Sequence, residues 1–543
     1  MLLMAGLTVS SLPIVRSTPE DIKIAVIGPK GWIQWDGLWE AAQMARDEIN
    51  AKGGILGHNI ALLDVDEHGK DLRPDLGIEE ALAALEAGAQ FFVGGFRTEC
   101  VGPIREAVMD YAAANGRPIW FIAGASTDAL IDCGGIGCGK CVRCNYNRYK
   151  YMFRITPMNS TMLFKQYAAF LRTYVLLKKL APMYGNYTGV TIPVTPTHPY
   201  EEKVYYPPVK TYIVAEDLTW CDLMVKCLAG NSTYPELYLG VPNPYPSPPS
   251  PYSILGPNSI IVGIARPSAY TPNFPPIFDD IDAKKARLII HIFSAIAGVD
   301  FIKTWKDRVT NALPVGINVE SQMQEFWAAV GGRCEYESFL ASVGTQTPIV
   351  PGYTDKFWAD YLARWGHCPI YTAWGAYDAI KALNETITAI GTWPLTCDQL
   401  IPYTEKTVRM GILGRFRYTG PNGTLHDVFC AADCLASTWP TRYVRALIPQ
   451  WQAGEMKVTW PQDQTYSRKF KIPPLMYPLA DWDVNFDGIV DIEDIYKAAL
   501  SYGAMPPNWD IEADMNTDGI VDIEDIYAIA LNYGRTVPKY PLP

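Results

Sequence analysis

Hydrophobic residues in the first 125 positions follow two alternating patterns. Short apolar runs rich in β-branched residues predict buried strands at 21–28, 58–66, 90–95 and 118–125. Between these runs, apolar residues recur at helical spacing and predict helices over 38–54, 76–88 and 102–114. Strands that alternate with helices predict βαβ units, and therefore an α/β fold built on a parallel sheet.

The loops that follow the predicted strands are the places to expect a ligand. In open parallel sheets, ligands bind beyond the carboxyl ends of the strands. Here those loops are 29–36, 96–100 and 124–128. We therefore expect a binding site of this part of the chain to use residues of these three loops.

Two later segments interrupt the alternation. Residues 183–210 and 234–257 are dense in Pro and Tyr, which predicts stiff, extended chain. Tyr offers a large contact area at a low cost in side-chain entropy, so these insertions suit contacts with another protein. The alternative interpretation is loop stiffening in a heat-adapted secreted protein.

The last part of the chain carries a duplicated acidic pattern. Residues 483–494 read DVNFDGIVDIED, residues 514–525 read DMNTDGIVDIED, and each copy continues into a helical run. Calcium takes about 6–8 oxygen ligands, and the D-x-N-x-D-G order places side-chain oxygens alternately along a tight turn. Gly488 and Gly519 supply that turn, because glycine reaches positive φ without a Cβ clash. We therefore expect two Ca²⁺ ions as cofactors.

The expected calcium ligands occupy equivalent positions of the two loops. In the first loop they are Asp483, Asn485, Asp487, the carbonyl of Ile489, Asp491 and Asp494. In the second loop they are Asp514, Asn516, Asp518, the carbonyl of Ile520, Asp522 and Asp525. The alternative, an acidic solvated tail, does not explain a duplicated pattern that keeps both glycines.

Composition and charge limit the class of protein. The chain is 49% hydrophobic and 19% charged, which is globular composition, and its length suits about three domains. A net charge of −11 argues against nucleic acid as a partner. Residues 1–15 are similar to the apolar part of a signal peptide without its positive n-region. We expect an exported protein, in which segment 1–20 is either cleaved or buried, for example in a neighbouring subunit.

The cysteines and glycosylation sequons fit an extracellular or cell-surface location. Twelve cysteines, an even number, suit an oxidising compartment. Within the Gly-rich cluster, the disulfide candidates are Cys133, Cys138, Cys141 and Cys144, although the spacing also permits iron–sulfur or zinc ligation. Cys221 and Cys227 are expected to pair with other cysteines. The glycosylation candidates are Asn159, Asn186, Asn231, Asn384 and Asn422.

Several stretches of the body resemble the type I periplasmic binding proteins, and in particular the branched-chain amino-acid binding proteins of ABC transporters. The resemblance is clear from IAVIG through EINAKGGILGH to FIAGASTDAL, and YMFRITPMNS resembles the first crossover between the lobes. It implies a two-lobed fold with parallel sheets flanked by helices and three crossovers. The implied lobe 1 is 21–155 and 350–410, and lobe 2 is 156–349 and 411–471. The implied partners are a small-molecule ligand and an ABC permease.

The same resemblance implies a set of ligand-binding residues. Lobe 1 would contribute Trp32, Trp35, Arg97, Thr98, Ala125, Ser126 and Thr127. Lobe 2 would contribute Trp220, Phe293, Asn318 and Glu320. Arg97 departs from the small hydroxyl residues of the family, and Asn318 replaces the carboxylate that pairs with the ligand's ammonium. A cleft that no longer binds a small molecule is therefore the alternative.

The C-terminal part, residues 481–535, resembles a type I dockerin, because each calcium loop precedes a helix and the Ile-Pro-Pro-rich linker 472–480 replaces an entering helix. This implies a small all-α, calcium-dependent module that docks onto a cohesin-like domain. The alternative is a calcium-stabilised module that docks only onto its own chain or onto a sister subunit. Residues 536–543 form a tail. The sequence has no H-E-x-x-H, G-x-S-x-G or phosphate-loop motif, so we do not expect an enzyme.

These patterns favour an extracellular solute-binding protein for a small polar ligand, such as an amino acid, an amide or a peptide-like compound, tethered through its calcium module. The alternative is a structural surface protein, a filament or surface-layer subunit that reuses the same fold. In that case calcium, the N-terminal segment or the insertions would make contacts between copies in a homo-oligomer.

Overall fold

The computed structural model describes residues 20–125, 127, 130–132, 139–155, 159–193, 201–229, 255–308, 311–341, 349–428, 446–461, 467–474, 476–477, 481–506 and 508–536. The candidates Ser126, Cys133, Cys138 and Asn231 lie outside these residues, as do the signal-like segment 1–19 and the end of the tail. Among the described residues, no helix combines the length and apolar character that a membrane crossing requires.

Lobe 1 is built on a five-stranded parallel sheet in the order β2-β1-β3-β4-β5. Its strands are β1 (Ile22–Gly28), β2 (Ile60–Asp66), β3 (Phe91–Gly94), β4 (Ile119–Ile122) and β5 (Met152–Arg154). Strands β3 and β4 are buried throughout, as expected for a sheet with helices on both faces. The predicted strands are confirmed within a few residues.

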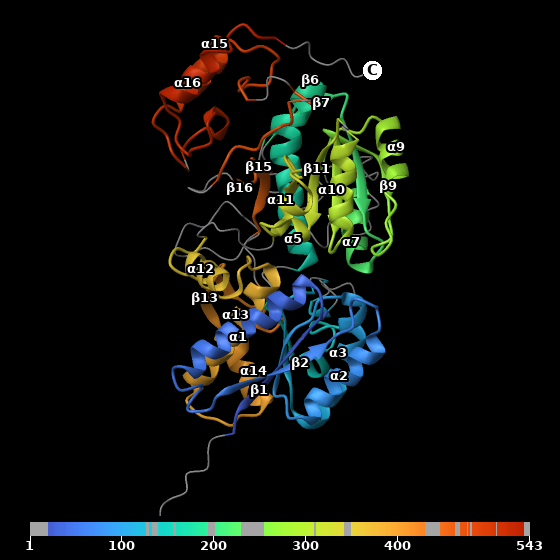
Figure 1. The fold of residues 1–543 in the computed structure, drawn as a ribbon, viewed down its shortest axis with the longest axis vertical. Coiled ribbons are helices and arrows are strands. Elements are labelled where there is room, and N and C mark those ends of the chain that lie inside the picture. The colour runs from blue at the N-terminus through green and yellow to red at the C-terminus, as the bar shows by residue number, and fades with distance from the viewer. Residues whose placement is uncertain are drawn as a thin grey trace, which may run out of the picture.

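Helices from two separate parts of the chain cover this sheet (Figure 1). The first part gives α1 (Ile33–Asn50), α2 (Pro74–Glu86), α3 (Thr98–Asn115) and α4 (Tyr146–Tyr149), and the later part gives α12 (Thr354–Trp365), α13 (Tyr371–Ile390) and α14 (Cys397–Glu405). Helix α1 begins five residues earlier than predicted because Gly37 does not break it. A Cβ atom at Gly37 would lie 2.7 Å from Thr372 Oγ1, so this glycine lets α1 pack closely on α13.

The hairpin of β13 (Val408–Gly411) and β14 (Gly414–Arg417) packs on lobe 1. Asp378 of α13 accepts hydrogen bonds from the backbone N–H of Ile412 at 3.0 Å and from Arg409 at 2.8 Å. Farther along, the buried Asp427 pairs with Arg154 of β5 at 3.0 Å. The assignment of 411–428 to lobe 2 was therefore wrong, because these polar contacts join the segment to lobe 1.

Lobe 2 contains a seven-stranded sheet in the order β16-β15-β12-β11-β10-β8-β9, in which β15 and β16 run antiparallel to their neighbours. Its strands are β8 (Val209–Ala215), β9 (Ser259–Ala265), β10 (Leu288–Phe293), β11 (Leu313–Asn318), β12 (Ser338–Phe339), β15 (Ile448–Gln452) and β16 (Glu455–Trp460). The helices are α5 (Ser160–Phe170), α6 (Ala181–Tyr184), α7 (Thr219–Ala229), α9 (Pro275–Ala283), α10 (Ala297–Asp307) and α11 (Phe326–Ala329). A π-helix, η2 (Leu171–Leu180), continues α5, and a 3₁₀ turn, η3 (Glu320–Gln322), follows β11.

The described ends of the first Pro/Tyr insertion form a two-stranded ribbon of β6 (Asn186–Ile192) and β7 (Glu202–Tyr206). The chain is extended here, as predicted, and Tyr187, Val190 and Tyr206 are exposed on the ribbon. Most of the second insertion, through residue 254, lies outside the described residues.

The C-terminal module consists of η5 (Ile511–Ala513) and the two helices α15 (Ile492–Leu500) and α16 (Ile523–Ala530). Its halves exchange equivalent hydrogen bonds, from Gly503 N to Val521 O at 2.7 Å and from Gly534 N to Val490 O at 2.8 Å. The duplicated sequence is thus a reciprocal pair in space. The module lies beside lobe 2, at the end of the molecule away from lobe 1 (Figure 1).

Candidate functional site

Polar side chains from both lobes meet where the strands of the two sheets end. Glu67 follows β2 and Arg97 follows β3 in lobe 1, whereas Glu216 follows β8 and Ser294 follows β10 in lobe 2. This is the carboxyl-end placement that open α/β sheets use for ligands. Figure 1 shows the two lobes facing each other across this region.

Arg97 is the central cation of this site and is only 2% exposed. Its Nη1 donates to Ser294 Oγ at 2.6 Å and lies 3.7 Å from Glu216 Oε1. Glu67 fixes the backbone below it, since its two carboxylate oxygens accept from the N–H groups of Phe96 and Arg97, each at 2.7 Å. The guanidinium is therefore held by lobe 1 and satisfied in part by lobe 2.

Several buried atoms of the site have no hydrogen-bond partner among the described residues. They are Arg97 Nε and Nη2, together with Glu216 Oε2. Nε and Nη2 form one edge of the guanidinium, the fork that binds the two oxygens of a carboxylate in parallel. A buried polar group without a partner is costly, so this edge and the free Glu216 oxygen are places where a ligand would be stabilised.

Aromatic rings surround the guanidinium. The Arg97 guanidinium carbon lies 4.9 Å from the ring centre of Trp32, 5.4 Å from that of Phe96 and 5.9 Å from that of Tyr270. These rings exclude water and interact favourably with a cation. They would also offer apolar surface to a small ligand.

The buried carboxyl groups of Glu67 and Glu216, and the half-buried one of Glu320 in lobe 2, have raised pKa values. Burial raises the pKa of Glu67 to about 7, against the lowering effect of its two backbone hydrogen bonds. Burial also raises the pKa of Glu216, although Arg97 and the hydroxyl of Ser294 favour its ionised form. Glu320, in η3, has its pKa raised to about 7 by burial alone.

Direct hydrogen bonds join the two lobes in this structure. Glu99 Oε1 of lobe 1 accepts from the backbone N–H and the hydroxyl of Thr219 in lobe 2, at 3.0 and 2.8 Å. Gln34 Nε2 donates to the carbonyl of Ser294 at 3.3 Å. The lobes are therefore closed on each other.

The structure brings some of the predicted ligand residues together. Arg97 and Trp32 lie at the centre, and Thr98 contacts Thr127 through their hydroxyl groups at 2.7 Å. Trp220 contributes indirectly, because its indole N–H donates to Glu216 at 2.7 Å. Ala125 is buried, and its carbonyl accepts from Arg154.

Three of the predicted ligand residues lie elsewhere, and their assignment is corrected. Phe293 is fully buried in a lobe 2 cluster, with its ring 5.1 Å from that of Phe301. Asn318 is also fully buried and donates to Glu337 at 3.0 Å. Trp35 belongs to α1 and stacks on Trp39 at 5.5 Å.

Sequence reasoning missed Glu67, Glu216, Ser294 and Tyr270. A signal for the first three was present, since each is a polar residue that directly follows a strand of a parallel sheet. Tyr270 lies in a loop after β9 and carries no such signal.

The two duplicated loops, 483–494 and 514–525, have similar φ angles at equivalent positions. Gly488 and Gly519 have φ angles of 97° and 98°, and Phe486 and Thr517 have φ angles of 59° and 62°. In the first loop, Asp483 accepts from Gly488 N at 2.8 Å and Asp494 accepts from Val484 N at 2.7 Å. In the second, Asp514 accepts from Gly519 N at 3.1 Å and Asp525 accepts from Met515 N at 2.7 Å.

The carboxylates at the first and last positions of each loop, which belong to Asp483, Asp494, Asp514 and Asp525, are buried. Burial raises the pKa of Asp483 and of Asp514 to about 6, with nearby carboxylates adding to the effect. Buried carboxylates that repel one another fit a cation. However, among the described residues no three His, Cys, Asp or Glu side chains are grouped as metal ligands would be.

Seven of the twelve cysteines can be described by their burial. Cys100, Cys221, Cys334, Cys368 and Cys397 are buried free thiols, so the expectation that Cys221 pairs with another cysteine is wrong here. Cys141 is buried and Cys144 is exposed. Burial raises the pKa of the Cys100 thiol to about 12, and that of Cys397 to about 12, which makes both unreactive.

The described glycosylation candidates differ in accessibility. Asn186 and Asn422 are exposed and Asn384 is half-buried. Asn159 is 9% exposed, and its amide nitrogen donates to Asp427 at 3.0 Å. This buried amide is a poor glycan acceptor, so its candidacy is withdrawn.

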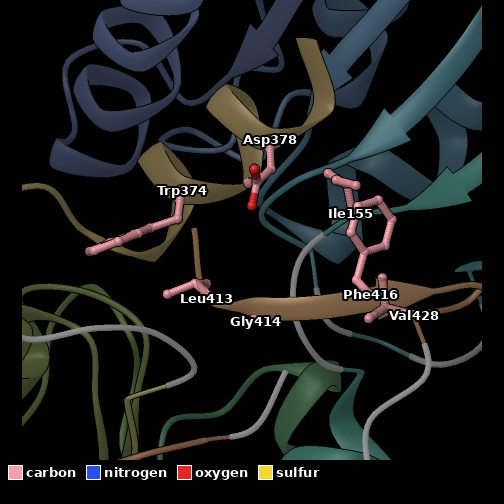
Figure 2. Close-up of a pocket in the computed structure, with 8 residues that line it drawn as sticks. Ile155, Trp374, Asp378, Leu413, Gly414, Phe416 and Val428 are labelled. Carbon is pink, nitrogen blue, oxygen red and sulfur yellow. The ribbon is translucent and has the colours of Figure 1, made fainter. Parts of the chain in front are cut away.

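A small cavity lies away from the interlobe site, between α13 and the β13–β14 hairpin. Figure 2 shows Trp374 and Asp378 of α13 on one side, and Leu413, Gly414 and Phe416 on the other. The carboxylate of Asp378 is already used by Arg409 and Ile412. The cavity therefore belongs to the packing of the hairpin.

Comparisons with known proteins agree with this architecture. Residues 22–188 match the model of a family described as periplasmic binding protein. A search of curated proteins gives no match. The fold is that of a type I periplasmic binding protein, as expected.

Three solved structures illustrate the likeness. One from Silicibacter pomeroyi, assigned to a branched-chain amino acid ABC transporter, aligns with a TM-score of 0.60 and 16% identity over 84% of this chain and 100% of that one. The leucine-, isoleucine-, valine-, threonine- and alanine-binding protein of Brucella ovis, in a closed conformation, aligns with a TM-score of 0.56 and 15% identity over 80% of this chain and 90% of that one. A Rhodopseudomonas palustris solute-binding protein in complex with 3,4-dihydroxybenzoic acid aligns with a TM-score of 0.55 and 13% identity over 80% of this chain and 95% of that one.

Proposed function

We propose that this chain is an extracellular solute-binding protein that captures a small carboxylic acid, in particular an amino acid, between its lobes for delivery to an ABC permease. The observation that carries the proposal is the free Nε–Nη2 edge of the buried Arg97. A ligand carboxylate would bind this edge in a fork. An ammonium or hydroxyl group of the same ligand would donate to the free oxygen of Glu216.

The interlobe hydrogen bonds support a closure mechanism. A ligand that contacts Arg97 in lobe 1 and Glu216 in lobe 2 stabilises the closed arrangement by its differential affinity for that arrangement. The similar folds of solved structures bound to amino acids or aromatic acids are consistent with this class of ligand.

A direct test is calorimetric titration of the full chain with a panel of amino acids and aromatic acids, each paired with its neutral amide. We expect an acid to bind and its amide to bind at least about 30-fold more weakly, because an amide lacks the second anionic oxygen. Arg97→Met should remove binding, whereas Arg73→Met, an exposed arginine paired with Asp75, should not. Binding that survives Arg97→Met would refute the assignment.

We also propose that residues 481–535 bind two Ca²⁺ ions through the loop residues predicted above. Their shared geometry and buried carboxylates support this. Titration should give two calcium ions per chain, and Asp483→Ala and Asp514→Ala should each leave one. A chain that binds no calcium would refute this part alone.

The module would dock onto a cohesin-like domain at the cell surface. Equivalent residues of its two helices form two exposed apolar stripes, made of Ile492, Tyr496 and Leu500 on α15 and of Ile523, Tyr527 and Leu531 on α16. An exposed apolar surface of this extent indicates a contact with another protein. The alternative function, a self-assembling surface subunit, would use the same stripes between copies of the chain.

A further inference from the structure

The calcium module packs against lobe 2 of its own chain through a buried ion pair. Lys179 of η2 pairs with Glu512 of η5, and both side chains are almost completely buried. The hydroxyl of Tyr174, also in η2, donates to the other oxygen of Glu512 at 2.9 Å. Lys469, which follows β16, donates to the Glu512 carbonyl at 3.0 Å. One carboxylate of the module is thus held by two side chains of lobe 2.

Apolar contacts extend this interface. The ring centre of Phe486, in the first loop, lies 4.7 Å from Lys179 Nζ. The same ring stacks on Tyr477, with the two ring centres 5.8 Å apart. Val484 and Phe486 belong to the same buried cluster as Tyr174 and Phe470 of the body. The module therefore shares a core with lobe 2.

The π-helix explains how Tyr174 and Lys179 reach the same carboxylate. In an α-helix of 3.6 residues per turn, two residues five positions apart point about 140° away from each other. A π-helix instead joins residues i and i+5 by its hydrogen bonds, as an α-helix joins i and i+4, so both side chains lie on the same face of the helix. Lys178, the neighbour of Tyr174 at i+4, is exposed, although its Nζ lies 5.9 Å from the centre of the Tyr174 ring. It is Lys179 that is buried and pairs with Glu512.

We propose that the module is a clasp for lobe 2, in which Glu512 binds the Tyr174–Lys179 face that the π-helical register creates. Docking of the module and the π-helical register of Leu171–Leu180 then stabilise each other. Glu512 lies two residues before Asp514, the first position of the second loop, and Tyr477 donates to Asp483, the first position of the other loop, at 2.5 Å. Where the proposed calcium binding holds, calcium tightens this clasp by ordering both loops.

The two adjacent lysines provide a register-sensitive test. The full chain would carry Lys179→Met, Lys178→Met or Glu512→Gln, alone and in pairs, with Glu524→Gln on the exposed side of the module as the matched control. Amide hydrogen exchange of residues 171–184 would be followed by mass spectrometry. We expect Lys179→Met and Glu512→Gln each to speed exchange by about 100-fold, because a broken ion pair leaves a buried charge. Lys178→Met and Glu524→Gln should have no effect.

The paired variants decide between the two registers. Lys179→Met combined with Glu512→Gln should be no worse than either change alone, since both remove the same contact. Coupling of Glu512 to Lys178 instead, or unchanged exchange in both single variants, would overturn the clasp. Tyr174→Phe, which keeps the ion pair and the ring, provides a milder variant if a charge change prevents folding.

The calcium part is tested separately, by titrating each variant with calcium alone. A wild-type chain that binds no calcium, but whose exchange depends on Lys179 and Glu512, would refute the calcium proposal and keep the clasp. If the chain binds two calcium ions but amide exchange is equal in wild type and Glu512→Gln, the clasp is refuted and the calcium proposal is kept.

Discussion

The two buried carboxyl groups of the cleft are compensated by hydrogen bonds, whereas the half-buried Glu320 of lobe 2 is not. Glu67 accepts two backbone N–H groups, and Glu216 accepts from Ser294 and from the indole of Trp220. For Glu320, burial is the sole cause of the raised pKa, which reaches about 7. A carboxyl group without compensation prefers its neutral form, so Glu320 makes the stability of the chain sensitive to pH.

The direction of this sensitivity follows from linkage. The pKa of Glu320 is higher in the folded chain than its ordinary value of 4.5, so the folded state binds the extra proton between these limits. The contribution of Glu320 to the unfolding free energy is fully present below pH 4.5 and is lost as the pH rises through about 7. The loss amounts to up to about 3 kcal/mol.

Glu320→Gln should remove this contribution. Denaturant unfolding at a series of pH values should show a smaller decrease of the unfolding free energy between about pH 5 and 8 in the variant than in wild type. Each unit by which the pKa is raised corresponds to roughly 1.4 kcal/mol of that decrease. Glu325→Gln, at an exposed glutamate five residues away, serves as control. Identical pH profiles in wild type and Glu320→Gln would contradict the prediction.

Sequence patterns identified some cleft residues and not others, for a physical reason. Arg97 and Trp32 lie in loops after strands, where position alone indicates the ligand side. Phe293 ends β10, whose six residues are all buried, so no alternation along the strand shows which side chains face the cleft and which face the core.

Elements were predictable where helical or strand periodicity is regular. Lobe 1 follows its pattern closely, whereas the register of η2 does not show in the sequence. LRTYVLLKKL has ordinary helical composition, and the contact that favours the π-helix comes from Glu512, more than 300 residues later. Tertiary contacts of this range cannot be read from local periodicity.

The two exposed stripes of the module allow a prediction at the level of the helix. Tyr496 and Tyr527 are 64% and 62% exposed, whereas Ile529 on the opposite side of α16 is fully buried. Tyr496→Ser with Tyr527→Ser should change the unfolding free energy by less than about 1 kcal/mol. Ile529→Ala should cost about 2–5 kcal/mol, because it leaves a cavity.

Denaturant unfolding of the full chain, followed by tryptophan fluorescence, checks both values. If the tyrosine pair destabilises the chain as much as Ile529→Ala, the stripes are covered within the same molecule. They would then be unavailable to a cohesin-like domain or to a second copy of the chain.

At the scale of the whole molecule, polar contacts between the described residues join the two lobes around the proposed ligand site. Glu99 contributes two hydrogen bonds across the cleft without touching the free edge of Arg97. Closure and ligand contact are therefore separable. A protein whose closed state is only partly populated binds its ligand more weakly by that fraction.

Glu99→Ala should shift the empty protein toward the open arrangement. We expect small-angle scattering to show a larger radius of gyration for the empty variant, and the wild-type value once the carboxylic acid ligand is bound. Its affinity should fall by about tenfold or less, since only the closing equilibrium has changed. Arg97→Met should behave differently, because ligand no longer closes it at any concentration tested. Glu79→Ala, an exposed glutamate on α2, is the control. A Glu99→Ala chain that scatters like wild type without ligand would contradict the prediction. It would show that other contacts hold the lobes together.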